Sequence, residues 1–180
     1  MMYRSVYLAG PDVFYPNARD LGDAKTALCE EFGLKGRFPL DKQLDLTGLT
    51  PFQAGLAIYR GNLKLMDQCD IVIANLTPFR GPGMDGGTAF ELGYMQAQFK
   101  PVWGYSLDAR IYQQRVVQPT AGVDENGLSV ERFTMADNLM MIGAIEDSGG
   151  QFIARDGDCL NIDDHLQVLR ELLQALTAQV

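Results

Sequence analysis

The sequence has few of the residues that build a disulfide framework or a metal site. It contains three cysteines, Cys29, Cys69 and Cys159, and one histidine, His165. The cysteines are odd in number and form no C-x-x-C pair, which is typical of reduced thiols in a reducing compartment. One histidine and three scattered cysteines do not provide the ligand cluster of a zinc site. We therefore expect neither a metal nor another cofactor.

Basic charge and long apolar runs are also scarce. The chain has 15 Lys and Arg against 23 Asp and Glu, a formal net charge of −8. Binding to nucleic acid or to an anionic membrane requires clustered basic residues that neutralise phosphate. There is no run of about eighteen apolar residues, and no basic segment with a cleavage site precedes the first strand-like segment. We therefore expect a cytoplasmic protein whose partners are small molecules.

Strand-like and helix-like segments alternate along the whole chain. Its 180 residues, 47% hydrophobic, suffice for one full core, so we predict a single domain over 1–180. Strands are predicted at 5–9, 36–39, 71–76, 101–105 and 151–154, helices at 17–32, from 50, 88–98, 137–147 and from 163, and an irregular excursion at 108–126. This order predicts an α/β fold, a doubly wound, flavodoxin-like five-stranded parallel sheet with flanking helices.

Several helix details follow from the residue pattern. Thr50 and Pro51, with Gln53 three residues after Thr50, form a strong helix start. A buried stripe is predicted for that helix at Phe52, Leu56, Tyr59, Leu63 and Met66. The last helix is predicted to turn inward Leu166, Leu169, Leu172, Leu173 and Leu176. The helix at 137–147 is predicted to be capped by Asp137.

The segment 70–94 contains an apolar strand, a loop rich in glycine and proline, and a helix predicted to begin at Thr88. Such a loop lets the backbone approach a ligand closely, at the edge where a parallel sheet keeps its site. The loop has no Gly-Lys-Ser/Thr ending and no G-x-G-x-x-G, and two carboxylates, Asp85 and Glu91, would repel a phosphate. The segment therefore indicates carboxylate chemistry rather than a phosphate loop.

Four motifs occur in order, at 7–14 (YLAGPDVF), 39–43 (PLDKQ), 70–94 and 137–141 (DNLMM). With this set the sequence resembles the nucleoside 2-deoxyribosyltransferase family over roughly residues 5 to 153. The resemblance implies transfer of 2′-deoxyribose between nucleobases with retention, through a covalent deoxyribosyl-enzyme ester, in nucleoside salvage. The substrates it implies are 2′-deoxynucleosides and free nucleobases.

The resemblance also implies the catalytic roles. Glu91 corresponds to the nucleophile at C1′, Asp85 to the carboxyl group that exchanges a proton with the base, and Tyr7 to the hydroxyl that orients Glu91. Retaining glycosyl transfer does need one ionised carboxylate at the anomeric carbon and an acid near the leaving group. We place Glu91 in the first turn of its helix, where the helix dipole favours the ionised form. Structural roles compete, because Thr88-x-x-Glu91 is also a capping box and Asp85 a common turn residue.

Further substrate-binding residues implied by the resemblance are Gly10, Asp12, Phe14, Gln43, Asn62, Asn138 and Met140. Asp12 and Phe14 are expected on the sugar or base side of the pocket, and Gln43 at the nucleobase. Asn138 and Met140 correspond to residues that a neighbouring subunit contributes at the 5′ end of the sugar, which implies a homo-oligomer. Asn62 stands where some members have an aspartate, and it can donate a hydrogen bond but cannot ionise.

Two other functions stay open at this point. A 2′-deoxynucleoside 5′-phosphate N-hydrolase resembles the family in fold and carboxylate pair, but it would favour serines or basic groups where this chain has Asn138 and Met140. A non-catalytic sensor of nucleoside derivatives would have no need of both carboxylates. The sequence does not predict which bases are accepted.

Overall fold

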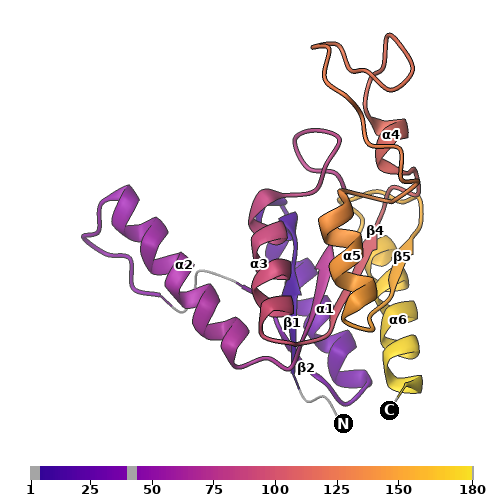
Figure 1. Cartoon of the computed structure of the whole chain (residues 1–180). Coiled ribbons are helices and arrows are strands. Elements are labelled where there is room, and N and C mark those ends of the chain that lie inside the picture. The colour runs from indigo at the N-terminus through magenta and orange to yellow at the C-terminus, as the bar shows by residue number, and fades with distance from the viewer. Residues whose placement is uncertain (1–4, 40–43, 180) are drawn as a thin grey trace.

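The computed structural model describes residues 5–39 and 44–179, and five parallel strands form its centre (Figure 1). The strands are β1 (Ser5–Ala9), β2 (Lys35–Arg37), β3 (Ile71–Asn75), β4 (Val102–Ser106) and β5 (Phe152–Ala154). They lie in the order β2-β1-β3-β4-β5, and each neighbouring pair is parallel. The prediction of a flavodoxin-like α/β sheet is confirmed.

Helices cover both faces of the sheet. They are η1 (Pro11–Phe14), α1 (Ala18–Glu31), α2 (Pro51–Asp67), α3 (Gly86–Ala97), α4 (Tyr112–Arg115), α5 (Leu139–Asp147) and α6 (Ile162–Ala178). α1 and α6 pack together on one face, and α3 and α5 pack together on the other (Figure 1). None of the helices in the described ranges has both the length and the apolarity to cross a bilayer.

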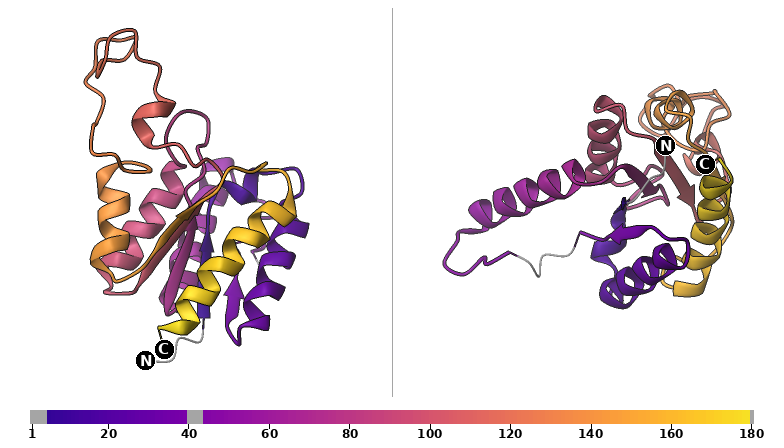
Figure 2. Two further views of the ribbon diagram at one scale, coloured as in Figure 1. Left: turned by 90° about the vertical axis from the view of Figure 1, so that its right-hand side faces the viewer. Right: turned by 90° about the horizontal axis from the view of Figure 1, so that it is seen from below.

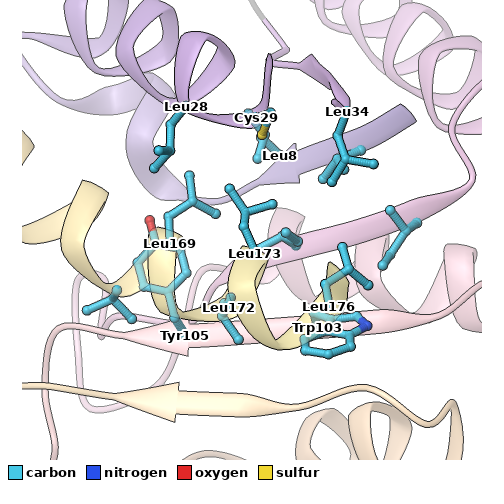
Figure 3. Close-up of a cluster of buried hydrophobic side chains, with 14 of the residues drawn as sticks. Leu8, Leu28, Cys29, Leu34, Trp103, Tyr105, Leu169, Leu172, Leu173 and Leu176 are labelled. Carbon is cyan, nitrogen blue, oxygen red and sulfur yellow. The ribbon is translucent and has the colours of Figure 1, made fainter. Parts of the chain in front are cut away.

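The face under α1 and α6 is the larger apolar core (Figure 3). Leu169, Leu172, Leu173 and Leu176 of α6 are buried against Leu8 of β1 and Trp103 and Tyr105 of β4. Leu166 packs against the same cluster while partly exposed, so the predicted inward stripe is confirmed. Each fully buried leucine contributes about 2 kcal/mol of transfer free energy.

The opposite face decides where the candidate site lies. Side chains alternate across a strand, so Val6 and Leu8 point toward α1 and α6 while Tyr7 points the other way. Tyr7 is fully buried in the cluster that contains Leu92 and Met95 of α3. This alternation places the Tyr7 ring against the helix that carries Glu91.

Helix α2 projects from the body, as the view from below shows (Figure 2). Its predicted start is confirmed, because Thr50 and Gln53 form the full capping box with Pro51 in the first turn. The prediction of a buried stripe is wrong at this end, since Phe52 is 77% and Tyr59 is 47% exposed. Only the far end of α2 reaches the core, and Met66 is its one fully buried side chain.

The segment between β4 and α5 rises above the carboxyl ends of the strands (Figures 1 and 2). It contains α4 and isolated bridges around Val123, so the predicted irregular excursion is partly regular. A buried ion pair between Arg115 and Asp137, 3.0 Å long, anchors it. The prediction that Asp137 caps the following helix is wrong. Its carboxylate is taken by Arg115, and Asn138 caps α5 by accepting the Met140 amide at 3.0 Å.

Candidate active site at the β1–β3 switch point

The site lies where the order of the sheet reverses. After β1 the chain adds β2 on one side, and β3 then pairs with β1 on the other. Crevices outside the carboxyl ends of two such strands are where open α/β sheets bind ligands. The segments that follow β1 and β3 meet here, because the Phe14 ring stacks on the Phe79 ring with centroids 5.2 Å apart and planes inclined by 20°.

Tyr7 and Glu91 join β1 to α3 on the face of the sheet that α3 covers. The Tyr7 hydroxyl donates a hydrogen bond of 2.5 Å to Oε1 of Glu91. Burial raises the pKa of Glu91 to about 7; the Tyr7 hydrogen bond opposes this rise, and the negative charge of Asp85 adds to it. Burial and the adjacent carboxylate raise the pKa of Tyr7 above its usual range, so the phenol stays a neutral donor.

Asp85 determines where α3 begins. Its Oδ2 accepts the Thr88 amide at 2.9 Å and the Thr88 hydroxyl at 3.0 Å, and the helix starts at Gly86. The predicted helix start at Thr88 is therefore wrong, and the competing role of Thr88 and Glu91 as a capping box does not occur. Glu91 lies beyond the first turn, where the helix dipole is weak, and its pKa is raised rather than lowered.

The two carboxyl groups thus have different environments. Glu91 is partly buried and held by Tyr7, whereas Asp85 lies at the junction of loop and helix. In the described part of the chain, Oδ1 of Asp85 has no hydrogen-bond partner. A pair of carboxyls set apart in this way can divide nucleophile and proton-donor roles between them.

Asp12 does not line an open pocket, contrary to expectation. It is fully buried, its Oδ2 is paired with Lys25, and its Oδ1 accepts Nδ2 of Asn75 at 2.6 Å. Gly10 lets the turn pass close over β3, because a Cβ at this position would lie 2.8 Å from the Asn75 Cβ. Both residues therefore hold the turn after β1 against the end of β3.

A chain of buried hydrogen bonds continues from this pair. Nζ of Lys25 donates to the Tyr105 hydroxyl at 2.6 Å, and Tyr105 lies 2.9 Å from Nδ1 of His165. Nε2 of His165 lies 3.0 Å from the carbonyl of Cys159. A carbonyl only accepts, so Nε2 carries the proton and Nδ1 accepts from Tyr105. The pKa of His165 is lowered, first by burial and then by the charge of Lys25, which keeps the ring neutral.

Sequence reasoning missed this network, although one signal was present. Lys25 lies on the face of α1 that buries Leu21 and Leu28, and a lysine on an apolar face needs a buried partner. Among residues 5–39 and 44–179, no three His, Cys, Asp or Glu side chains gather into a group that could hold a metal ion.

The other predicted residues lie farther out. Phe14 lies at the end of η1 and is 56% exposed, and Asn62 is partly buried in α2. Asn138 and Met140 are exposed at the start of α5, where Nδ2 of Asn138 donates to Glu131 at 2.9 Å. No hydrogen bond within the described part of the chain joins them to Tyr7, Asp85 or Glu91. Gln43 lies outside the described residues.

Fold and site together define an α/β protein with a paired-carboxylate site at the switch point of its sheet. The family model described as nucleoside 2-deoxyribosyltransferase matches residues 6–140. The chain belongs to the nucleoside 2-deoxyribosyltransferase family, which confirms the resemblance seen in its motifs.

Individual proteins show the same relationship. An uncharacterised protein of Schizosaccharomyces pombe is 40% identical, and the match covers 84% of this chain and 81% of that protein. The structure of 2-desoxiribosyltransferase from Leishmania mexicana is 34% identical, covers 77% of this chain and 85% of its own, and has a TM-score of 0.64. A conserved protein of Enterococcus faecalis, 19% identical with a TM-score of 0.56 over 94% of this chain and 99% of its own, shares the fold.

The Tyr7–Glu91 contact predicts a pKa change. The Tyr7 hydroxyl stabilises the ionised carboxylate, so Tyr7→Phe should raise the pKa of Glu91 by roughly one unit above its value of about 7. Carbon-13 NMR of protein labelled at the glutamate carboxyls measures this, with Glu91→Gln to assign the signal. Tyr94→Phe, which removes a hydroxyl bonded to Asp67 on the surface, is the control. An unchanged or lower Glu91 pKa in Tyr7→Phe would contradict the contact.

Proposed function

We propose that this protein transfers 2′-deoxyribose between nucleobases with retention at C1′, in nucleoside salvage. The observation that carries the proposal is the Glu91 carboxyl, held by the Tyr7 hydroxyl at 2.5 Å beside the switch point, with Asp85 at the head of the same helix. Membership of the family supports it, and so does the likeness to the Leishmania mexicana enzyme. The proposed substrates are 2′-deoxynucleosides and free nucleobases.

In the first step the ionised Glu91 attacks C1′ of the bound nucleoside. Oε1 is occupied by the Tyr7 hydrogen bond, so Oε2 forms the new bond to C1′. The bond from C1′ to the base nitrogen breaks at the same time, and Asp85 gives its proton to the departing base. The products are a deoxyribosyl ester of Glu91, a free base and the Asp85 carboxylate.

In the second step another base attacks C1′ of the ester. Asp85 takes the proton that the incoming nitrogen loses, and the bond between Oε2 and C1′ breaks to restore Glu91. Each step inverts the configuration at C1′, so the product retains it. Water in place of the second base would give free deoxyribose, which is why exclusion of water from the crevice matters for transfer.

Assembly into a homo-oligomer is part of the proposal. Phe52 and Tyr59 lie exposed on the projecting α2, and the Tyr59 ring contacts the Phe90 ring, itself 51% exposed, with ring centroids 6.1 Å apart. An apolar helix face of this kind needs a cover, and a second copy of the chain is the cover we propose. The exposed Asn138 and Met140 would then complete the sugar pocket of a neighbouring subunit.

Base exchange tests the function directly. Incubation with 2′-deoxyinosine and adenine should yield 2′-deoxyadenosine and hypoxanthine, which chromatography separates. Glu91→Ala and the isosteric Glu91→Gln should each lower the rate by about three decades or more, because the covalent nucleophile is lost. A Glu91→Ala protein that keeps a tenth of the wild-type rate would refute the assignment.

The same incubation separates the other functions. Free deoxyribose as the main sugar product, or 2-deoxyribose 5-phosphate when 2′-deoxyinosine 5′-phosphate is the substrate, would identify an N-hydrolase. No reaction with nucleosides or their 5′-phosphates, despite binding, would identify a sensor.

Asp85→Asn should distinguish the role of Asp85 as proton donor from its role as N-cap of α3. Asparagine keeps an oxygen that can accept the Thr88 amide, so α3 keeps its start, but the proton is gone. The rate should fall strongly for 2′-deoxyadenosine and little for a 2-deoxyriboside with para-nitrophenolate as leaving group, because a good leaving group needs no acid. Equal losses for both substrates would leave Asp85 with the capping role alone.

Mixed oligomers test the shared site. Glu91→Ala and Asn138→Ala should each be inactive, but mixing them should restore part of the activity, because some interfaces pair an intact Glu91 with an intact Asn138. Subunit exchange is verified with differently tagged chains. If exchange occurs and the mixture stays inactive, or if a monomer turns over at the full rate, the shared site is wrong.

A further inference from the structure

We propose that Arg80 selects the nucleobase, favouring 6-oxopurines such as hypoxanthine and guanine over adenine; this rests on the proposed function. Arg80 lies in the loop between β3 and α3. Its guanidinium carbon is 4.6 Å from the centre of the Phe79 ring and 5.4 Å from the centre of the Phe14 ring. Arg80 thus contacts both the segment after β1, through Phe14, and the segment after β3, through Phe79.

The guanidinium of Arg80 packs on two aromatic rings. In the described part of the chain it forms no hydrogen bond and no ion pair, so its N–H donors have no partner there. Stacking on rings leaves the in-plane N–H donors of an arginine free to bind a ligand. Arg80 also has a φ of 55°, a left-handed conformation that is uncommon and costs a non-glycine residue free energy.

The neighbouring ring provides a surface for a planar ligand. Phe79 stacks on Phe14, yet Phe14 remains 56% exposed. A nucleobase stacks favourably on an exposed aromatic face of this kind. Since Arg80 lies beside the same ring, its donors are within reach of the edge of a base stacked on Phe14.

The donors then discriminate between purines. A 6-oxopurine attached through N9 presents two acceptors, O6 and N7, on one edge, and arginine binds this pair with two parallel hydrogen bonds. Adenine presents N7 beside an amino group, which is a donor, and arginine has no acceptor to offer it. A phosphate could also bind Arg80, but it would make no use of the Phe14 ring, so the aromatic surroundings favour the base.

Binding of 9-methylhypoxanthine and 9-methyladenine, measured by calorimetry, tests the selection. Both have N9 blocked and no sugar, so they cannot react, and the result does not depend on transfer. The wild-type protein should bind 9-methylhypoxanthine more tightly, and Arg80→Gln should reduce the ratio of the two affinities by roughly tenfold or more, because glutamine complements adenine. Arg80→Lys should lose most of the preference, since it keeps the charge without the planar fork.

The control is Arg19→Ala, which removes an exposed arginine of α1 and should leave the ratio unchanged. An unchanged ratio in Arg80→Gln, equal weakening of both ligands, or no measurable binding of 9-methylhypoxanthine to the wild type would overturn the proposal. So would a loss confined to 2′-deoxyinosine 5′-phosphate, which would assign Arg80 to phosphate. If base exchange proceeds but Arg80→Gln leaves the ratio of the two affinities unchanged, only the role of Arg80 is wrong. If the wild-type protein prefers 9-methylhypoxanthine but catalyses no base exchange, only the proposed transfer is wrong.

Discussion

The hydrogen bond from Tyr7 to Glu91 is the interaction on which the candidate site depends. It ties the strand at the switch point to the helix that follows the next strand in the sheet, and it is the bond that stabilises an otherwise desolvated carboxylate. The position of Glu91 depends in turn on where α3 begins, because each residue of a helix turns by about 100°. By capping α3 at Gly86, Asp85 brings Glu91 opposite Tyr7, so one carboxyl group sets the geometry of the other.

A second buried network holds the turn that follows β1. Asp12, Lys25 and Asn75 tie the turn after β1 to α1 and to the end of β3. Lys25 extends the network through Tyr105 to His165 of α6. Such a network stabilises only when every member is satisfied, since a buried charge without its partner is costly. The segment η1, which ends at Phe14, is therefore anchored to α1 and to the end of β3.

The parts of the structure that could be predicted from the sequence are those governed by local patterns. The apolar run at 71–76 predicts a buried strand, and the spacing of the leucines in α6 predicts which face of that helix is buried. Both predictions are confirmed. The start of α3 was missed because either Asp85 or Thr88 can cap, and the choice depends on tertiary contacts. Phe52 and Tyr59 were wrongly placed in the core. The spacing of apolar residues shows that one face of a helix is apolar, but it does not show which element, if any, packs against that face. The burial of Asp12, which was expected to line the pocket, was missed for the same kind of reason, since its partner Lys25 lies in another element.

The central claim is that the Glu91 carboxyl becomes bonded to the sugar. Mass spectrometry of the intact protein, quenched in acid during turnover of 2′-deoxyinosine without an acceptor base, tests it most directly. We expect a mass increase equal to one deoxyribosyl group, located on Glu91 by fragmentation of the peptide and absent from Glu91→Gln. An adduct on another residue, or turnover at the full rate with no adduct at any quench time, would contradict it.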